Sequence, residues 1–134
     1  MEPIIVESRI SRKLEENQKY FDDKLRVGMN YDMLTSRMQI AGKSAVLYYI
    51  NGMYKDELMQ KVLQYLLSVK SEEMPQSASE FLQNNMPCTE VELEERKEKI
   101  LIAVLAGQIA LFIDGFDKCL IFDARQFPTR GVEE

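Results

Sequence analysis

The stretch from Ile100 to Ile113, ILIAVLAGQIALFI, carries no charged residue and constrains the fold more than any other part of the chain. It is shorter than the roughly 20 apolar residues that a membrane-spanning helix needs. Gly107 and Gln108 interrupt it. We therefore expect a buried helix end, a turn and a buried strand. A chain of 134 residues is long enough to bury them in a core of its own, as one domain.

Hydrophobic periodicity predicts the remaining elements. A possible N-cap at Ser8 opens the first helix, and capping-box spacings, Ser77 with Glu80 and Thr89 with Glu92, open two later ones. The expected order is helix 9–24, strands 36–41 and 44–50, helix 56–69, a short helix from residue 77, helix 91–105, and strands 108–113 and 118–124, with a possible short strand at 86–90. Four glutamates of helix 91–105 are interpreted as part of its solvated face: Glu92, Glu94, Glu95 and Glu98.

These elements predict one compact α/β (α+β) subdomain over residues 1–124. Its mixed β-sheet is built from two hairpins, and four helices pack on it. Residues 125–134 are interpreted as a C-terminal connector.

The tripeptide Gly42-Lys43-Ser44 resembles the end of a phosphate-binding loop, but its surroundings do not fit. Arg37 stands where the first glycine of G-x-x-x-x-G-K-[ST] belongs, and a strand-forming run follows where a helix should begin. We interpret the tripeptide as part of a hairpin turn at Gly42-Lys43.

Composition excludes several classes of function. The net charge of −5, with no basic stripe, argues against a nucleic-acid partner. The chain has no histidine, which removes the usual nucleophile–base systems and the commonest metal ligand. Cys88 and Cys119 form no CxxC motif and are expected to be buried, reduced thiols rather than a disulfide. No catalytic, cofactor-binding or metal-binding residue is expected.

The aspartates around the second hairpin give no calcium site either. Asp114, Asp117 and Asp123 do not have the spacing of a calcium-binding loop. Asp114-Gly115 is interpreted as turn chemistry.

Two blocks of the chain resemble the N-terminal soluble region of the A subunits of bacterial spore germinant receptors. The first, residues 30–66, matches the family pattern at Asp32, Arg37, Tyr49, Ile50, Gly52 and Asp56. The second, residues 104–134, matches it at Leu105, Gly107, Leu111, Gly115, Asp123, Arg125, Arg130, Glu133 and Glu134. Within the family, the stretches ENQKYF, YINGMYKD and FPTR resemble a stage V sporulation protein more than a germinant receptor proper.

The resemblance implies a larger membrane protein of the spore inner membrane, with this domain on the cytoplasmic, core side. Family members continue into a second soluble subdomain and membrane helices, and they are thought to assemble as homo-oligomers into ion channels. The implied partners are other copies and other germination proteins of that membrane. Membrane contact would run only through the following region. Germinant binding is attributed to a companion subunit, so no ligand site carries over.

The resemblance also implies roles for single residues. Structural roles fall to Asp32, Arg37, Gly52, Asp56, Gly107, Gly115 and Asp123. The connector candidates, which would contact the next subdomain, are Arg125, Arg130, Glu133 and Glu134.

Two classes of function follow from this reading. The first is a non-enzymatic module that contacts other subunits and couples the germination signal to ion release. The alternative is a small-molecule sensor or adaptor domain of an A subunit, because α/β modules often hold ligands between two lobes. An enzyme is not expected, since no nucleophile–base constellation is found.

Overall fold

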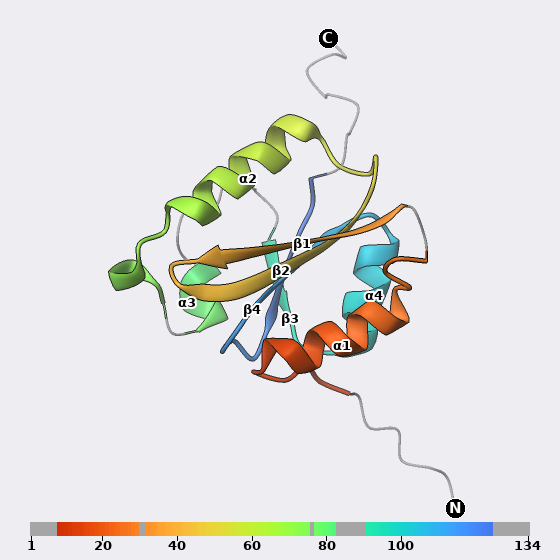
Figure 1. Ribbon diagram of the computed structural model, residues 1–134, viewed down its shortest axis with the longest axis horizontal. Coiled ribbons are helices and arrows are strands. Elements are labelled where there is room, and N and C mark those ends of the chain that lie inside the picture. Colours follow the sequence, from red (N-terminus) through yellow and green to blue (C-terminus); the bar gives the residue numbers. More distant parts are fainter. Residues whose placement is uncertain (1–7, 30–31, 76, 83–90, 125–134) are drawn as a thin grey trace, which may run out of the picture.

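The computed structural model describes residues 8–29, 32–75, 77–82 and 91–124. Figure 1 shows the chain in sequence colours. The elements are α1 (Leu14–Lys24), β1 (Met33–Ile40), β2 (Lys43–Ile50), α2 (Asp56–Ser68), a 3₁₀ helix (Ser71–Glu73), α3 (Ala78–Leu82), β3 (Val91–Glu94), α4 (Lys97–Leu105), β4 (Ile109–Ile113) and β5 (Cys119–Phe122).

The strands form one five-stranded sheet in the order β1-β2-β4-β5-β3. The expected α+β class, with two hairpins and four helices, is confirmed. The pairing differs from the mixed sheet that the sequence suggested, because all described pairs are antiparallel. Each hairpin supplies an antiparallel pair, and the two hairpins join through an antiparallel contact between β2 and β4.

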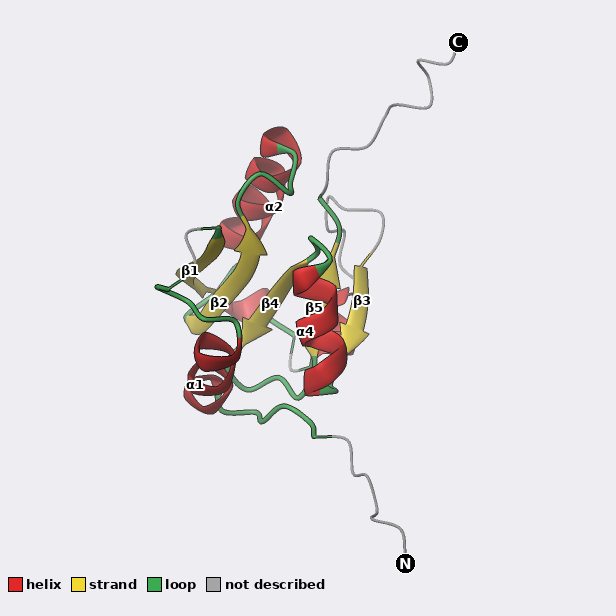
Figure 2. Ribbon diagram, turned by 90° about the vertical axis from the view of Figure 1, so that its right-hand side faces the viewer, coloured by secondary structure: helices red, strands yellow, loops and turns green. Residues whose placement is uncertain are grey.

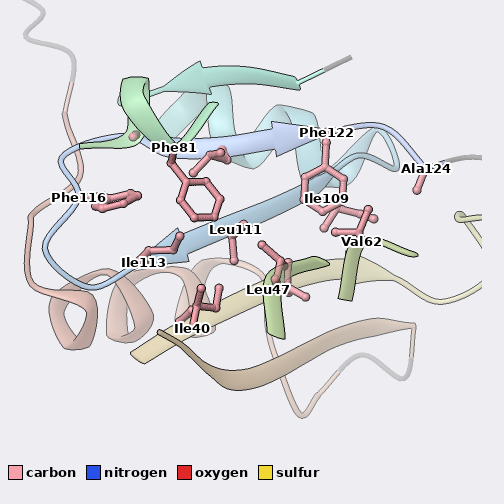
Figure 3. Close-up of a cluster of buried hydrophobic side chains, with 14 of the residues drawn as sticks. Ile40, Leu47, Val62, Phe81, Ile109, Leu111, Ile113, Phe116, Phe122 and Ala124 are labelled. Carbon is pink, nitrogen blue, oxygen red and sulfur yellow. The ribbon is translucent and has the colours of Figure 1, made fainter. Parts of the chain in front are cut away.

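Helices cover both faces of this sheet, which gives three layers (Figure 2). On one face, α2 and α3 enclose a first core, shown in Figure 3. Among its fully buried members are Ile40, Leu47, Val62, Leu66, Phe81, Ile109, Leu111, Leu120 and Phe122.

On the opposite face, α1 and α4 enclose a second core. Its centre is aromatic: the Phe21 and Phe112 rings lie 4.8 Å apart, and Tyr48 meets Phe112 edge-on at 5.8 Å. Cys119 is buried in this core and burial raises the pKa of its thiol, as expected for an inert structural cysteine. Cys88 lies outside the described residues.

Strands β2 and β4 serve both cores at once, because successive side chains of a strand point to opposite faces. Leu47 enters the first core, and Val46 and Tyr48 enter the second. All residues of β4 are buried. The expected sequence of buried helix end, turn and buried strand over residues 100–113 is confirmed.

The turn between α4 and β4 depends on Gly107. Its φ is +100°, a left-handed conformation in which side chains are strained. The N–H of Gly107 donates to the carbonyl of Val104, and the N–H of Gln108 donates to the carbonyl of Ala103. This pair of bonds is the Schellman motif, which satisfies the last carbonyls of the helix and stops it.

Two predicted helices begin later than expected. The first begins at Leu14, not at residue 9, and Ser8 does not cap it. The Leu14 N–H instead donates to Asp114 Oδ1 at 2.9 Å, from the turn between β4 and β5.

The helix predicted over 91–105 is wrong in its first part, because residues 91–94 form β3, paired with β5. Glu92 and Glu94 therefore lie on a strand, and only Glu98 lies on α4.

The first hairpin turn is confirmed with a shift of one residue. It consists of Ala41 and Gly42, with φ angles of +53° and +87°, rather than Gly42 and Lys43. The expected cap at Ser77 is also present, because its hydroxyl accepts the Glu80 N–H at 3.2 Å. The possible strand at 86–90 and the connector 125–134 lie outside the described residues.

Candidate functional site

One end of the sheet gathers five of the seven residues to which the resemblance assigns structural roles, and we call it the connector end. It consists of Asp32, the turn from Asn51 to Asp56, Gly107, Asp123 and Ala124. The strand register brings these segments together. Met33 pairs with Ile50, and Ile109 pairs with Phe122. The same end of the sheet therefore holds the start of β1, the end of β2, the start of β4 and the end of β5 (Figure 1).

Two backbone hydrogen bonds tie the connector end together. The Asn51 N–H donates to the Asp32 carbonyl at 2.7 Å, and the Lys55 N–H donates to the Ala124 carbonyl. Gly52 lies between them with φ +84°, and no atom lies within 4 Å of the place where a Cβ would stand. A glycine is therefore favoured at this position by its left-handed backbone, not by a close neighbour.

A surface hollow of about 490 Å³ opens at the connector end. Its lining comes from one segment: Asn51, Gly52, Tyr54, Lys55, Asp56 and Glu57. The Tyr54 ring packs edge-on against Tyr49 at 5.4 Å. Desolvation raises the pKa of Tyr54, with Tyr49 and Asp56 adding to the effect. The hollow offers hydrogen-bonding groups and one aromatic ring, which suits contact with a polar partner more than chemistry on a substrate.

Arg37 lies away from the connector end, in the middle of β1. With the Gln18 amide in the orientation that satisfies both groups, its oxygen accepts from Arg37 Nε at 3.0 Å and Nη2 at 3.2 Å. The neighbouring Tyr48 hydroxyl donates to Asp22 Oδ1 at 2.7 Å. Burial raises the pKa of Tyr48, and the bond to Asp22 adds to this. Arg37 and Tyr48 thus join the sheet to α1.

Gly115 lies at the opposite end of the sheet, in the turn between β4 and β5. Its φ is +95° and its N–H donates to the Arg12 carbonyl at 2.8 Å. The turn chemistry predicted for Asp114-Gly115 is confirmed. Asp114 also holds the start of α1, a contact that no sequence pattern predicted.

Four exposed apolar side chains lie close in sequence to the segments of the connector end, and sequence reasoning missed them. Met29 comes shortly before Asp32, and Met53 lies in the turn after β2. Ile102 and Leu105, on the last turns of α4, are 63% and 65% exposed. The signal was present in ILIAVL, which has more apolar residues than one buried helix face needs.

Metal clusters and membrane-spanning helices are absent from the part of the chain that the structure describes, and the connector candidates lie outside it. Among residues 8–29, 32–75, 77–82 and 91–124 there is no cluster of three cysteine or carboxylate side chains that could hold a metal ion. No helix in these ranges is long and apolar enough to cross a membrane. The four connector candidates, Arg125, Arg130, Glu133 and Glu134, lie outside them.

Comparison with known proteins gives one family. A family model described as Bacillus/Clostridium GerA spore germination protein matches residues 19–134. Stage V sporulation protein AF of Bacillus subtilis (strain 168) is 26% identical over 127 residues, which cover 94% of this chain and 26% of that protein. The uncharacterized membrane protein YfkQ of the same strain is 30% identical over 94 residues, 69% of this chain and 18% of that protein.

A solved structure shares the fold. The crystal structure of the N-terminal domain of the A subunit of the Bacillus megaterium spore germinant receptor GerK3 superposes with a TM-score of 0.71 at 21% identity. The match covers 92% of this chain and 50% of that one. The chain therefore spans about a quarter or less of the curated relatives and half of the solved domain. The predicted resemblance, including that to the stage V sporulation protein, is confirmed.

Proposed function

Because the chain belongs to the GerA family of Bacillus/Clostridium spore germination proteins, we propose that it is the N-terminal module of a channel-forming protein in the spore inner membrane. The module faces the spore core, contacts other subunits and couples the germination signal to ion release. It acts without enzymatic chemistry. The names of the relatives support a germination-related role and a membrane setting.

The observation that carries the proposal is the connector end. Five family-pattern residues gather there, and four exposed apolar side chains lie within a few residues of its segments along the chain. Exposed apolar groups gathered at one place are typical of a docking surface. In this proposal the connector end meets the region that follows Ala124, through Arg125, Arg130, Glu133 and Glu134, and transmits movement to it.

A matched pair of leucines tests this surface. Leu105 and Leu67 are 65% and 64% exposed, but Leu67 lies near the C-terminal end of α2, away from the connector end. Spores would carry the full-length protein with Leu105→Lys or Leu67→Lys in place of the native protein. We expect Leu105→Lys to slow the release of monovalent cations severalfold, and Leu67→Lys to leave it unchanged.

Protein amounts in the inner membrane, measured by blotting, must match for this comparison to hold. Equal rates for the two variants would contradict the proposed docking surface. Arg130→Ala serves as the test of the connector, and a normal rate of cation release with this variant would contradict the role of Arg130.

The proposed location in the spore inner membrane is tested by fractionating spores and blotting with an antibody to this domain. We expect a band well above 15.6 kDa in the inner-membrane fraction only. A band near 15.6 kDa in the soluble fraction would contradict the membrane proposal.

The hollow beside Tyr54 supports a second candidate, a small-molecule sensor. Its volume of about 490 Å³ falls in the range of ligand sites. Thermal unfolding would be followed with amino acids, nucleosides and monovalent salts at millimolar concentrations, with Asp56→Asn as the matched variant. A rise in melting temperature that Asp56→Asn removes would favour the sensor, because a ligand stabilises the state it binds. No shift with any of these compounds would argue against it.

A further inference from the structure

The two edge strands of the sheet are protected very differently. Strand β3 is short and carries two glutamates, Glu92 and Glu94. Just beyond it, the N-terminal segment pairs with the chain: the Ile10 N–H donates to the Glu95 carbonyl at 2.9 Å, and the Lys97 N–H donates to the Ser8 carbonyl at 2.8 Å. Short length, charge and a covering segment are the devices by which proteins prevent edge pairing.

Strand β1, at the other edge, lacks these devices. It has eight residues, no proline and one charge, Arg37. Figure 2 shows it at the outer border of the sheet. Within the described residues, no strand pairs with its outer side.

The two-residue turn fixes which backbone groups of β1 point outward. Ile40 and Lys43 flank the turn and form a hydrogen-bonded pair, so alternate residues from Ile40 backward bond to β2. The Asn51 N–H bond to Asp32 and the Asp114 N–H bond to Ser44 follow the same alternation. The outward N–H and C=O groups therefore belong to Met33, Thr35, Arg37 and Gln39.

We infer that this edge pairs with β1 of a second copy, antiparallel, about a two-fold axis at Ser36. The inference rests on the proposed role in subunit contact and names the strand that makes it. In this register Thr35 lies opposite Arg37 of the partner subunit, and Met33 lies opposite Gln39 of the partner subunit. On the other face, Leu34 meets Met38 of the partner subunit. The two sheets then become continuous.

Side-chain chemistry favours this register over its neighbours. An axis at Arg37 would place two guanidinium groups directly opposite each other, which destabilises a strand pair. With an axis at Thr35, Gln39 would extend past Met33, the residue at which β1 of the partner subunit begins. Gln39 would then have no strand residue to pair with. With the axis at Ser36, Arg37 of one copy lies opposite Thr35 of the other, so no two like charges face each other.

Cysteine cross-linking tests the axis. Residues at position 36 would form a non-hydrogen-bonded pair with Cα atoms about 4.5 Å apart, close enough for a disulfide. The parent is this chain with Cys88→Ser, and Cys119 is buried. Under mild oxidation we expect Ser36→Cys to give a cross-linked dimer, and Gln39→Cys, which would lie opposite Met33, to give at least fivefold less.

A proline variant tests the backbone bonds. Gln39→Pro removes an outward N–H that makes no bond to β2, so the fold tolerates it while the pairing does not. In the Ser36→Cys chain, Gln39→Pro should lower the cross-linked fraction at least fivefold, and Gln39→Ala should leave it unchanged. Circular dichroism melts verify that each variant is folded.

Equal cross-linking of Ser36→Cys and Gln39→Cys, or of the proline and alanine variants, would overturn the inference. So would a parent chain that sediments as a monomer up to millimolar concentration. The cross-linking results judge only the pairing of β1. The spore experiments on Leu105 and Arg130 judge the proposed function independently.

Discussion

At the scale of single residues, Glu94 shows how one side chain shapes the backbone around it. Its carboxylate accepts Arg96 Nε at 2.7 Å and Nη2 at 3.0 Å, and also the backbone N–H groups of Arg96 at 3.0 Å and Glu95 at 3.1 Å. These bonds hold the corner where β3 ends and α4 begins. The side-chain bond from Arg96 is the main reason that the pKa of Glu94 falls to about 2.

A neutral side chain at this position should weaken the protein in a pH-dependent way. We expect Glu94→Gln to lower the free energy of unfolding at pH 7 by about 1.5–3 kcal/mol, the range for hydrogen bonds to charged groups. The pKa is depressed in the folded state, so the stabilisation is complete above the unfolded value near 4.5 and is lost as the pH falls toward 2.

Denaturant unfolding at pH 7, 4 and 2.5 measures this difference. The gap between the parent and Glu94→Gln should narrow as the pH falls. The exposed Glu92, on the same strand, gives the control variant Glu92→Gln, which should change stability little at any of these pH values. A gap of constant size for Glu94→Gln would show that its charge is not the cause.

At the scale of elements, the turn between β1 and β2 is under strain that a substitution can relieve. Both of its residues are left-handed, which is typical of a type I′ turn, and Asn-Gly is the preferred pair for such turns. Ala41 adopts φ +53° with a Cβ that opposes this conformation. We expect Ala41→Asn to raise the free energy of unfolding by about 1 kcal/mol. Thermal unfolding measures the shift, and Ala41→Val, which should destabilise, provides the opposite control.

The elements also show what the sequence can and cannot predict. Both hairpins were predictable, because their strands are neighbours in sequence and their turns carry glycines. Residues 91–94 were not, since Glu92 and its neighbours favour a helix locally while pairing with β5 makes them a strand. The V-E-L-E alternation was the available signal, and it places Val91 and Leu93 against the first core. The family pattern predicted the glycines of the connector end, but only the strand order brought them together.

At the scale of the whole molecule, two cores share one sheet. Val62 on α2 and Val104 on α4 are both fully buried, one in each core. Between them lie β2 and β4, whose side chains alternate between the two cores. Loss of packing on one face therefore loosens strands that the other face needs, and we expect the chain to unfold as a single unit.

A pair of matched valine substitutions tests this coupling. Val62→Ala and Val104→Ala should each lower the free energy of unfolding by about 2 kcal/mol, because each leaves a cavity in a packed core. For both variants, tyrosine fluorescence and far-UV circular dichroism should report one coincident transition. Amide exchange in β2 and β4 should accelerate by a similar factor in both. A variant that melts in two steps, or in which amide exchange accelerates only in the elements of its own face, would contradict this coupling. It would show instead that the two cores unfold independently.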